Sequence, residues 1–255
     1  MTLRMRAAAL AMIVAVAAAG CGFGKKYEYE EDVTISLDGS ATVVINTSIA
    51  ALVALRGLDH SLDGAARIDR ERIRALYESP VTRVTRVSRP WSRAGRRFIQ
   101  IRVETDDIRK LTAAAPFSWS KYELTSKDTL ATFRQTVGPS AFRPGTMPNV
   151  GWQGNEVVAF RLHLPSSIRH HNSRSLEKDE PAEVERGNIL RWEQQLTDRL
   201  DGRPIDILVE METQSILYRT LWLFAGAFTA AVALMVFLLW LTVRRGAKES
   251  EPTTS

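Results

Sequence analysis

Cysteine is nearly absent from this sequence, which has one such residue among 255. One cysteine excludes an intrachain disulfide and any zinc module built from several cysteines. The sequence also lacks a Gly-x-Ser-x-Gly nucleophile elbow, a phosphate-binding P-loop and a Gly-x-Gly-x-x-Gly pattern. Hydrophobic residues make up 45% of the chain and charged residues 25%, which excludes a wholly disordered or collagen-like protein. We therefore expect a folded protein that is not an enzyme.

Histidine is also scarce, and a metal cluster would have to use His163, His170 and His171. Neighbouring residues on a strand point to opposite faces, so His170 and His171 cannot readily share one ion. An acidic run near residue 30, comprising Glu28, Glu30, Glu31 and Asp32, lacks the spacing of a calcium-binding EF-hand. We expect this run to be a solvated strand edge, and we expect no metal site and no cofactor.

The N-terminus has the layout of a secretory leader. Arg4 and Arg6 precede an apolar stretch from Ala7 to Gly20. This stretch is shorter than the roughly 20 residues that a bilayer-spanning helix needs, whereas a basic start and a short apolar run are typical of a signal peptide. We predict a signal peptide over residues 1–20.

The leader ends in Ala18-Ala19-Gly20-Cys21, which resembles the lipobox of bacterial lipoproteins. The resemblance implies that Cys21 becomes the new N-terminus and carries diacylglycerol, with palmitate among the acyl groups. Ala18 departs from the pattern, in which leucine is commonest there. The alternative is a buried cysteine in an uncleaved signal anchor. In the lipoprotein interpretation, residues 21–26 form the lipidated cysteine and a short tether.

A second apolar segment lies near the other end of the chain. Thr220 to Val243 carries no charge over 24 residues, enough for about 36 Å of helix. Tyr218, Trp222 and Trp240 lie near its ends, where amphipathic rings favour the membrane interface. We predict a transmembrane helix over residues 219–243.

The basic residues beside the two apolar segments predict one topology. Arg244 and Arg245 follow the second segment, and the positive-inside rule places them in the cytoplasm. Residues 22–218 then lie outside the cytoplasm, and residues 244–255 form a cytoplasmic tail. We expect the protein in the cytoplasmic (inner) membrane of a bacterium. The lipid on Cys21 and the transmembrane helix are expected in the same leaflet-facing region, because Cys21 lies so close to the domain.

The net charge of +5 is unevenly distributed. The leader and the tail account for more than half of it, so the extracytoplasmic part has no footprint for nucleic acid. The window from Arg67 to Val103, however, contains eleven arginines and only three acidic residues. Arginine suits bidentate pairing with phosphate or carboxylate. The alternative is a set of solvated faces with internal salt bridges.

If anionic headgroups are the ligand, we expect the arginines of this window to bind them, with Trp91 inserting at the interface. The candidate ligand-binding residues are Arg83, Arg86, Arg89, Trp91, Arg93, Arg96 and Arg97.

Residues 27–215 have the pattern of an α+β domain. Asp38-Gly39 separates two alternating apolar runs, which strongly predicts a hairpin. Ser48 and Gly57 flank a short apolar helix as its cap and its stop. Further helices are expected over 65–77 and from Asp106 or Asp107 to about 115. Further strands are expected over 81–88, 98–103, 117–124, 130–137, 158–164, 189–194 and 205–211, and loops over 89–95, 138–154 and 173–187. The predicted fold is an antiparallel sheet of about eight strands with two or three helices on one face.

The order of these parts resembles the LppM-type lipoprotein domain family of bacteria. The matching positions are Leu37-Asp38-Gly39-Ser40, Leu162-His163-Leu164-Pro165, Gly187-Asn188 with Trp192, and a span at Leu221–Val243. The resemblance implies a lipobox leader, an α+β ectodomain, a C-terminal span and, in some members, binding of lipid or lipoglycan. It implies no catalytic residues. The arginine-rich window and the loop at 138–154 depart from the family.

We therefore expect a membrane-anchored envelope lipoprotein whose domain binds lipid headgroups or lipoglycan near the membrane. The alternative is a structural or assembly subunit that binds an envelope protein through its sheet edges and the apolar segment from Ser48 to Leu55. An enzyme would require a concave site with convergent carboxylates or histidines.

Overall fold

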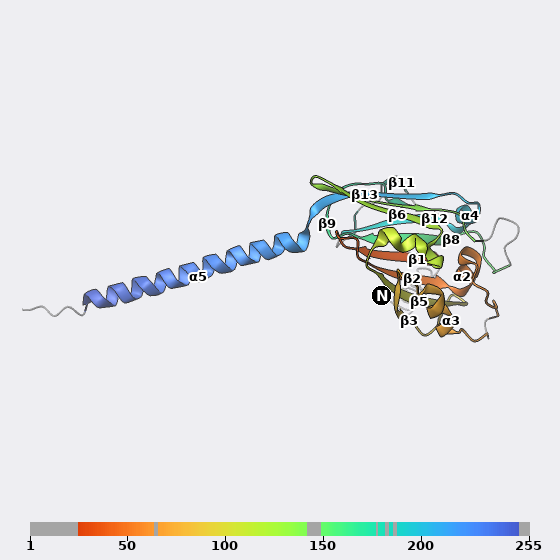
Figure 1. The fold of residues 1–255 in the computed structure, drawn as a ribbon, viewed down its shortest axis with the longest axis horizontal. Coiled ribbons are helices and arrows are strands. Elements are labelled where there is room, and N and C mark those ends of the chain that lie inside the picture. The colour runs from red at the N-terminus through yellow and green to blue at the C-terminus, as the bar shows by residue number, and fades with distance from the viewer. Residues whose placement is uncertain are drawn as a thin grey trace, which may run out of the picture.

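The computed structural model describes residues 25–63, 66–141, 149–176, 178–181, 184–185 and 188–249. The predicted signal peptide, Cys21 and most of the tether lie outside the described residues, as do the last residues of the tail. The fold is a mixed α+β arrangement of two sheets, a few short helices and a long C-terminal helix (Figure 1). The predicted fold class is confirmed.

The larger sheet has nine strands in the order β11-β10-β12-β8-β1-β2-β5-β3, with β4 also paired to β5. Its strands are β1 (Lys26–Ile35), β2 (Ala41–Ser48), β3 (Arg83–Val87), β4 (Trp91–Arg93), β5 (Arg96–Thr105), β8 (Glu156–His163), β10 (Arg174–Ser175), β11 (Lys178–Pro181) and β12 (Ile189–Gln195). The smaller sheet has the order β6-β7-β13-β9. Its strands are β6 (Ser120–Lys127), β7 (Leu130–Val137), β9 (Ser166–His171) and β13 (Ile205–Ser215).

The first hairpin forms where the sequence predicts it. β1 and β2 pair antiparallel, and Ile35 lies opposite Ala41 across the turn. Asp38 Oδ1 accepts hydrogen bonds from the Ser40 backbone N–H at 2.9 Å and from the Ser40 hydroxyl at 2.8 Å. Gly39 has a φ of 98°, which glycine adopts far more readily than other residues. The Asp-Gly signal therefore fixed both the turn and the register.

The larger sheet differs from the expected antiparallel arrangement in two parallel pairings, that of β1 with β8 and that of β10 with β12. In β8 the residues from Glu156 to Phe160 are buried in succession. A continuous buried run is typical of a strand covered on both faces. Alternating sequence patterns show that a strand is amphipathic but do not encode the direction of its neighbour.

The first short helix, α2 (Ile49–Arg56), also matches the sequence prediction. The Ser48 hydroxyl accepts a hydrogen bond from the Ala51 backbone N–H at 2.9 Å, and Gly57 ends the helix with a φ of 68°. α2 packs against β1, β2 and β5, and nearly all its side chains are buried. The apolar segment from Ser48 to Leu55 is thus mainly core, with Ala50 as its one partly exposed residue.

The other helices are shorter than expected. α3 (Arg70–Tyr77) begins after Asp69, whose carboxylate caps it, and not at Ala65. The segment after Asp107 forms two 3-10 helices, η1 (Ile108–Ala113) and η2 (Ala115–Phe117), and not one α-helix. A last short helix, α4 (Leu196–Leu200), lies between β12 and β13.

Two segments that we expected to be loops contain short strands. β4 lies within 89–95, and Ala94 and Gly95 connect it to β5 with φ values of 49° and 73°. Such positive values at both positions are typical of a two-residue hairpin turn, but Ala-Gly is a weak signal for it. β10 and β11 lie within 173–187 and pair at the end of the larger sheet.

The two sheets and the helices share one hydrophobic core. Inward residues of both sheets meet there, including Tyr29 of β1 and Phe133 of β7. The Trp119 ring packs edge-on against Tyr29, with 5.4 Å between centroids, and lies tilted against Phe160, with 5.9 Å between centroids. Burial of this aromatic and aliphatic surface is the main stabilising contribution to the fold.

The C-terminal helix α5 (Ile216–Glu249) follows β13 without an intervening residue. By length and composition its stretch Ile216–Arg244, with a mean hydropathy of 2.3, is able to cross a membrane. It projects away from the sheets, and the apolar stretch is not buried against them (Figure 1). The predicted span at 219–243 lies within this stretch.

Candidate functional site

The predicted arginines lie on β3, β4 and β5 and in the segment between β3 and β4, at one edge of the larger sheet. β3 is the last strand in the sheet order, and both β3 and β4 pair with β5. Successive side chains on a strand point to opposite faces, so Ile101 and Val103 of β5 are buried while Arg102 between them is exposed on the outer face. The edge therefore gathers basic groups from three strands.

Four arginines and one tryptophan form what we call the basic edge: Arg86, Arg89, Trp91, Arg93 and Arg102. All five side chains are exposed. Within the described residues, the guanidinium groups of these four arginines form no ion pair with a carboxylate. Arg86 lies directly opposite Arg102 in the β3–β5 register, and like charges in that position repel. A bound anion between them would relieve this repulsion.

Trp91 lies at the end of this edge and is 39% exposed. Its ring stacks on Phe98, with 5.9 Å between centroids and an interplanar angle of 22°, and the two residues face each other in the β4–β5 register. Stacking fixes the position of the indole, and a partly exposed indole suits a membrane interface.

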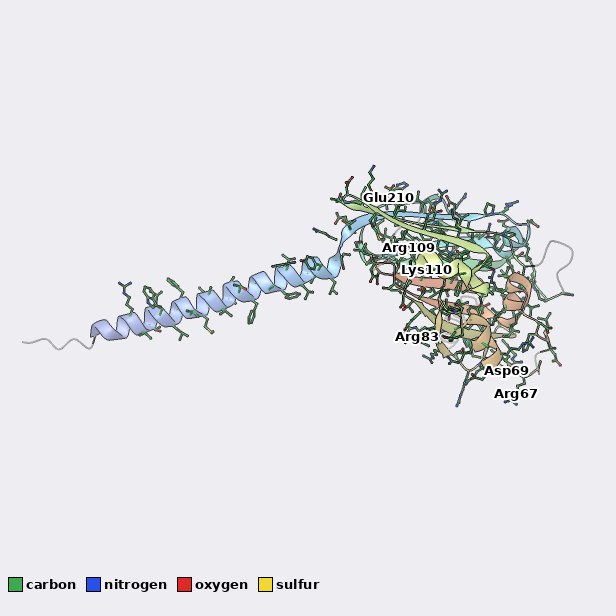
Figure 2. The ribbon with its side chains drawn as sticks, in the orientation of Figure 1. Arg67, Asp69, Arg83, Arg109, Lys110 and Glu210 are labelled. Atoms are coloured by element: carbon green, nitrogen blue, oxygen red, sulfur yellow. The ribbon has the colours of Figure 1, made fainter. Side chains whose placement is uncertain are left out.

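Arg83 lies on the same strand as Arg86 but at its opposite end. Its guanidinium pairs with the Glu104 carboxylate, which lies opposite it on β5. Figure 2 places Arg83 toward the end of the domain where α5 departs, whereas Arg67 lies toward the other end. Because Glu104 compensates its charge, Arg83 does not belong to the basic edge.

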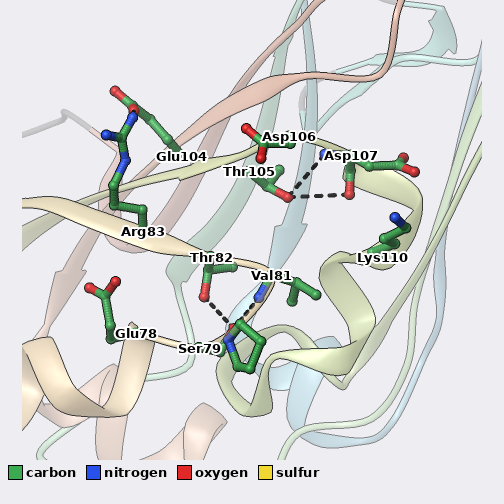
Figure 3. A pocket seen from close by; sticks show the side chains of 11 residues that line it. Glu78, Ser79, Val81, Thr82, Arg83, Glu104, Thr105, Asp106, Asp107 and Lys110 are labelled. Carbon is green, nitrogen blue, oxygen red and sulfur yellow. Dashed lines mark hydrogen bonds and ion pairs between the residues drawn. The ribbon is translucent and has the colours of Figure 1, made fainter.

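Arg83 and Glu104 also line a surface pocket of about 560 Å³ (Figure 3). Among its lining residues are four carboxylates, namely Glu78, Glu104, Asp106 and Asp107. Glu78 accepts a hydrogen bond from the Val84 N–H at 2.9 Å. A hydrogen bond from Arg109, at 2.7 Å from its Nε, lowers the pKa of Asp107. Glu78, Glu104 and Asp107 are thus engaged in contacts that hold the local structure.

Arg96 points into the fold. Its Nη1 lies 3.1 Å from Glu28 Oε1, and its Nη2 lies 3.1 Å from Glu156 Oε1. Both carboxylates are buried. Burial raises the pKa of Glu28. Burial also acts to raise the pKa of Glu156, but hydrogen bonds from the N–H groups of Gln153 and Gly154 outweigh it and the pKa is lowered.

Arg97 is half-buried and donates a hydrogen bond to the Ala66 carbonyl, ahead of α3. Arg96 and Arg97 thus hold the structure beneath the basic edge. Of the seven predicted residues, the structure brings Arg86, Arg89, Trp91 and Arg93 together on the exposed edge. Arg102 was missed, although alternation with Ile101 and Val103, which are buried, places its side chain outward.

The acidic run near residue 30 is not a solvated strand edge. β1 is an inner strand of the larger sheet, and Glu28 and Glu31 are buried. Glu31 accepts hydrogen bonds from Tyr29, Tyr122 and Gln135. Burial raises the pKa of Glu31, and these hydrogen bonds oppose the rise. An alternating acidic strand looks solvated in sequence, and the partners that bury it come from distant strands.

The histidines are dispersed. His163 Nε2 lies 2.8 Å from Asp32 Oδ1, and the His171 ring lies 2.8 Å from the Ser173 hydroxyl. His170 is exposed and faces Glu210 in the β9–β13 register. Within the part of the chain that the structure describes, no three histidine, cysteine or acidic side chains are placed to hold a metal ion.

Neither a protein-family model nor a curated protein matches this sequence. Among solved structures, the fold is similar to the NMR structure of the folded domain of LppM from Mycobacterium tuberculosis. The match covers 77% of this chain and 96% of that chain, with 11% identity and a TM-score of 0.40. Values this low show neither a common family nor a common function.

Proposed function

We propose that this protein is a membrane-anchored envelope lipoprotein without catalytic activity, whose extracytoplasmic domain binds anionic headgroups of lipid or lipoglycan. The basic edge is the observation that carries the proposal. It presents four exposed arginines beside a partly exposed tryptophan. Guanidinium groups pair bidentately with phosphate, and each basic residue near an anionic surface contributes about 1 kcal/mol to binding.

The location is part of the same proposal. α5 supplies a span by length and composition, and it begins directly after β13. Arg244 and Arg245 follow the apolar stretch and support a cytoplasmic C-terminus. We propose the bacterial cytoplasmic membrane, with the sheets on the extracytoplasmic side and a diacylglycerol group on Cys21.

The test is the lipid that accompanies the full chain when it is purified in mild detergent from bacterial membranes. Mass spectrometry should find a near-stoichiometric anionic lipid or lipoglycan. The triple variant Arg86→Gln, Arg89→Gln, Arg93→Gln should lose most of it. A matched triple variant with the same loss of charge, at Arg134, Arg169 and Arg203, should retain it, because those arginines pair with acidic residues elsewhere.

Equal amounts of lipid in all three proteins would contradict headgroup binding at the basic edge. The alternative is an assembly subunit. It is supported by two exposed apolar side chains near the opposite edge of the larger sheet, where β10 and β11 lie, namely Leu176 and Val184. Crosslinking in intact cells that yields one stoichiometric protein partner, together with no bound lipid, would favour assembly.

A further inference from the structure

We infer that the domain lies lengthwise along the bilayer that anchors it, with the basic edge held against the surface of that same bilayer. This inference rests on the proposed lipidation of Cys21 and on the proposed span. It specifies the partner of the basic edge as the membrane beneath the protein, and not a soluble ligand or another protein.

The two anchored segments leave the domain from opposite ends. Lys26 begins β1 and pairs with Glu156, at the start of the parallel strand β8. β8 ends at His163, and β9 then begins at Ser166, which pairs with Ser215 at the end of β13. α5 starts at the next residue. The N-terminal tether thus leaves beside the start of β8, and the span leaves near its end.

The separation between these exits exceeds the reach of the tether. β1 and β8 stay paired from Lys26 to Thr34, which corresponds to about 25 Å of strand. Lys25 is fixed to the domain, because its Nζ lies 2.7 Å from Glu193 Oε2. Between Cys21 and Lys25 a fully extended chain covers about 14 Å. If the domain stood upright on α5, a lipid on Cys21 could not enter the bilayer, so the domain must lean down.

The end that is drawn down carries the basic edge. Lys26 Nζ donates to Gln153 Oε1 at 3.1 Å, and Arg96 Nη2 donates to the Gly151 carbonyl, two residues earlier, at 2.9 Å. Arg96 lies opposite Arg93 in the β4–β5 hairpin. The start of β1 and the β4–β5 hairpin therefore share one end of the larger sheet.

The chemistry of that end suits an anionic membrane surface. Arg89 and Arg93 supply exposed positive charge, and Trp91 supplies an indole at the depth where tryptophan is favoured. The opposite end, near the start of α5, holds the pocket whose lining has four carboxylates and two basic residues, Arg83 and Lys110. The charge distribution thus favours contact with anionic lipid at the β4–β5 end.

The test measures the height of each end above the membrane. The full chain is reconstituted into vesicles of phosphatidylethanolamine and phosphatidylglycerol that contain a headgroup nitroxide lipid. Lipidation removes the thiol of Cys21, so Ser92→Cys and Asp128→Cys each provide one fluorophore site. Ser92 lies in β4, and Asp128 lies in the β6–β7 turn beside Thr129, whose carbonyl accepts from the Thr213 N–H.

We expect strong nitroxide quenching at both sites. In a chain whose residues 1–21 are replaced by a conventional cleavable signal peptide, quenching at Ser92→Cys should fall several-fold while quenching at Asp128→Cys persists. Lipid on Cys21 by mass spectrometry together with an unquenched Ser92→Cys probe would overturn this inference alone. Absence of lipid on Cys21 would overturn both it and the lipoprotein proposal. Unchanged quenching at Ser92→Cys without the lipid would refute the tether argument.

Discussion

The Glu31 carboxylate of β1 accepts a hydrogen bond of 3.1 Å from the Tyr122 hydroxyl of β6, so a buried acid joins the two sheets. Gln135 of β7 donates to the same oxygen at 2.9 Å, and Tyr29 donates to the other oxygen. A carboxylate in this position is desolvated but fully engaged. It specifies how the sheets face each other at some cost in stability when it is ionised.

Glu31 therefore predicts a pH dependence of stability. Burial raises its pKa above the 4.5 of an ordinary glutamate, so the folded protein binds this proton at higher pH than the unfolded chain. The resulting stabilisation is complete below about pH 4.5 and is lost as the pH rises through the folded-state pKa. In the wild type the free energy of unfolding should therefore rise as the pH is lowered from 7 to 5. Glu31→Gln should remove the part of this rise that comes from Glu31, as measured by denaturant unfolding of the full chain in detergent. Glu71→Gln, on an exposed helix face, is the control and should retain the wild-type curve.

Arg96 is expected to be structural. Arg96→Met leaves Glu28 and Glu156 buried without their cation and should destabilise the domain by about 3 kcal/mol. The same measurement on Arg93→Met should show little change because that side chain is exposed. Adding Glu28→Gln to Arg96→Met should restore part of the loss. Equal stability of the two methionine variants would refute the role assigned to this ion-pair cluster.

Asn172 is expected to tie the two sheets together at another point. Its Oδ1 accepts from the Leu208 N–H of β13 at 2.8 Å and from the Trp192 indole of β12 at 3.0 Å. Asn172→Ala leaves the Leu208 N–H without its acceptor, whereas the Trp192 indole keeps the Asn172 backbone carbonyl at 3.0 Å, and it should cost about 2 kcal/mol in denaturant unfolding. Asn172→Asp keeps the acceptor and should cost less. A larger loss of stability in Asn172→Asp than in Asn172→Ala would show that the hydrogen bond from Asn172 Nδ2 to the Asp206 carbonyl matters more than the acceptor.

Gly138 has no room for a side chain. A Cβ there would lie 2.8 Å from the Trp119 carbonyl oxygen, which is backbone and cannot rotate away. Gly138→Ala should destabilise the domain by about 1–3 kcal/mol in a thermal melt. Gly226→Ala serves as the control, since nothing lies within 4 Å of its Cβ. Similar melting temperatures for both variants would mean that the loop after β7 shifts freely.

The sequence predicted local features well because they depend on neighbouring residues. The turn at Asp38-Gly39 and the caps of α2 at Ser48 and Gly57 follow from hydrogen bonds within a few positions. The parallel pairing of β1 with β8 joins residues more than a hundred positions apart, and the division into two sheets depends on pairings such as that of β7 with β13, which are also distant in sequence. No local pattern encodes these, so the expected single antiparallel sheet became two.

The same distinction applies to the candidate site. A density of arginines is visible in sequence, but the side toward which each one points depends on the strand it occupies. The sequence could not separate Arg93, which is exposed, from Arg96, which neutralises two buried carboxylates. Those carboxylates lie on β1 and β8, far from Arg96 along the chain.

The continuity of β13 with α5 has a mechanical consequence. β13 is hydrogen-bonded on both sides, to β7 and to β9, and β1 is likewise held between β2 and β8. A pull along the strand axis at the start of β1 or at the end of β13 loads two ladders in shear, so many hydrogen bonds must break together rather than one after another. With the two proposed anchors in place, tension between them would be carried by inner strands of both sheets, and the domain would resist it as a rigid unit instead of losing its strands one by one from an edge.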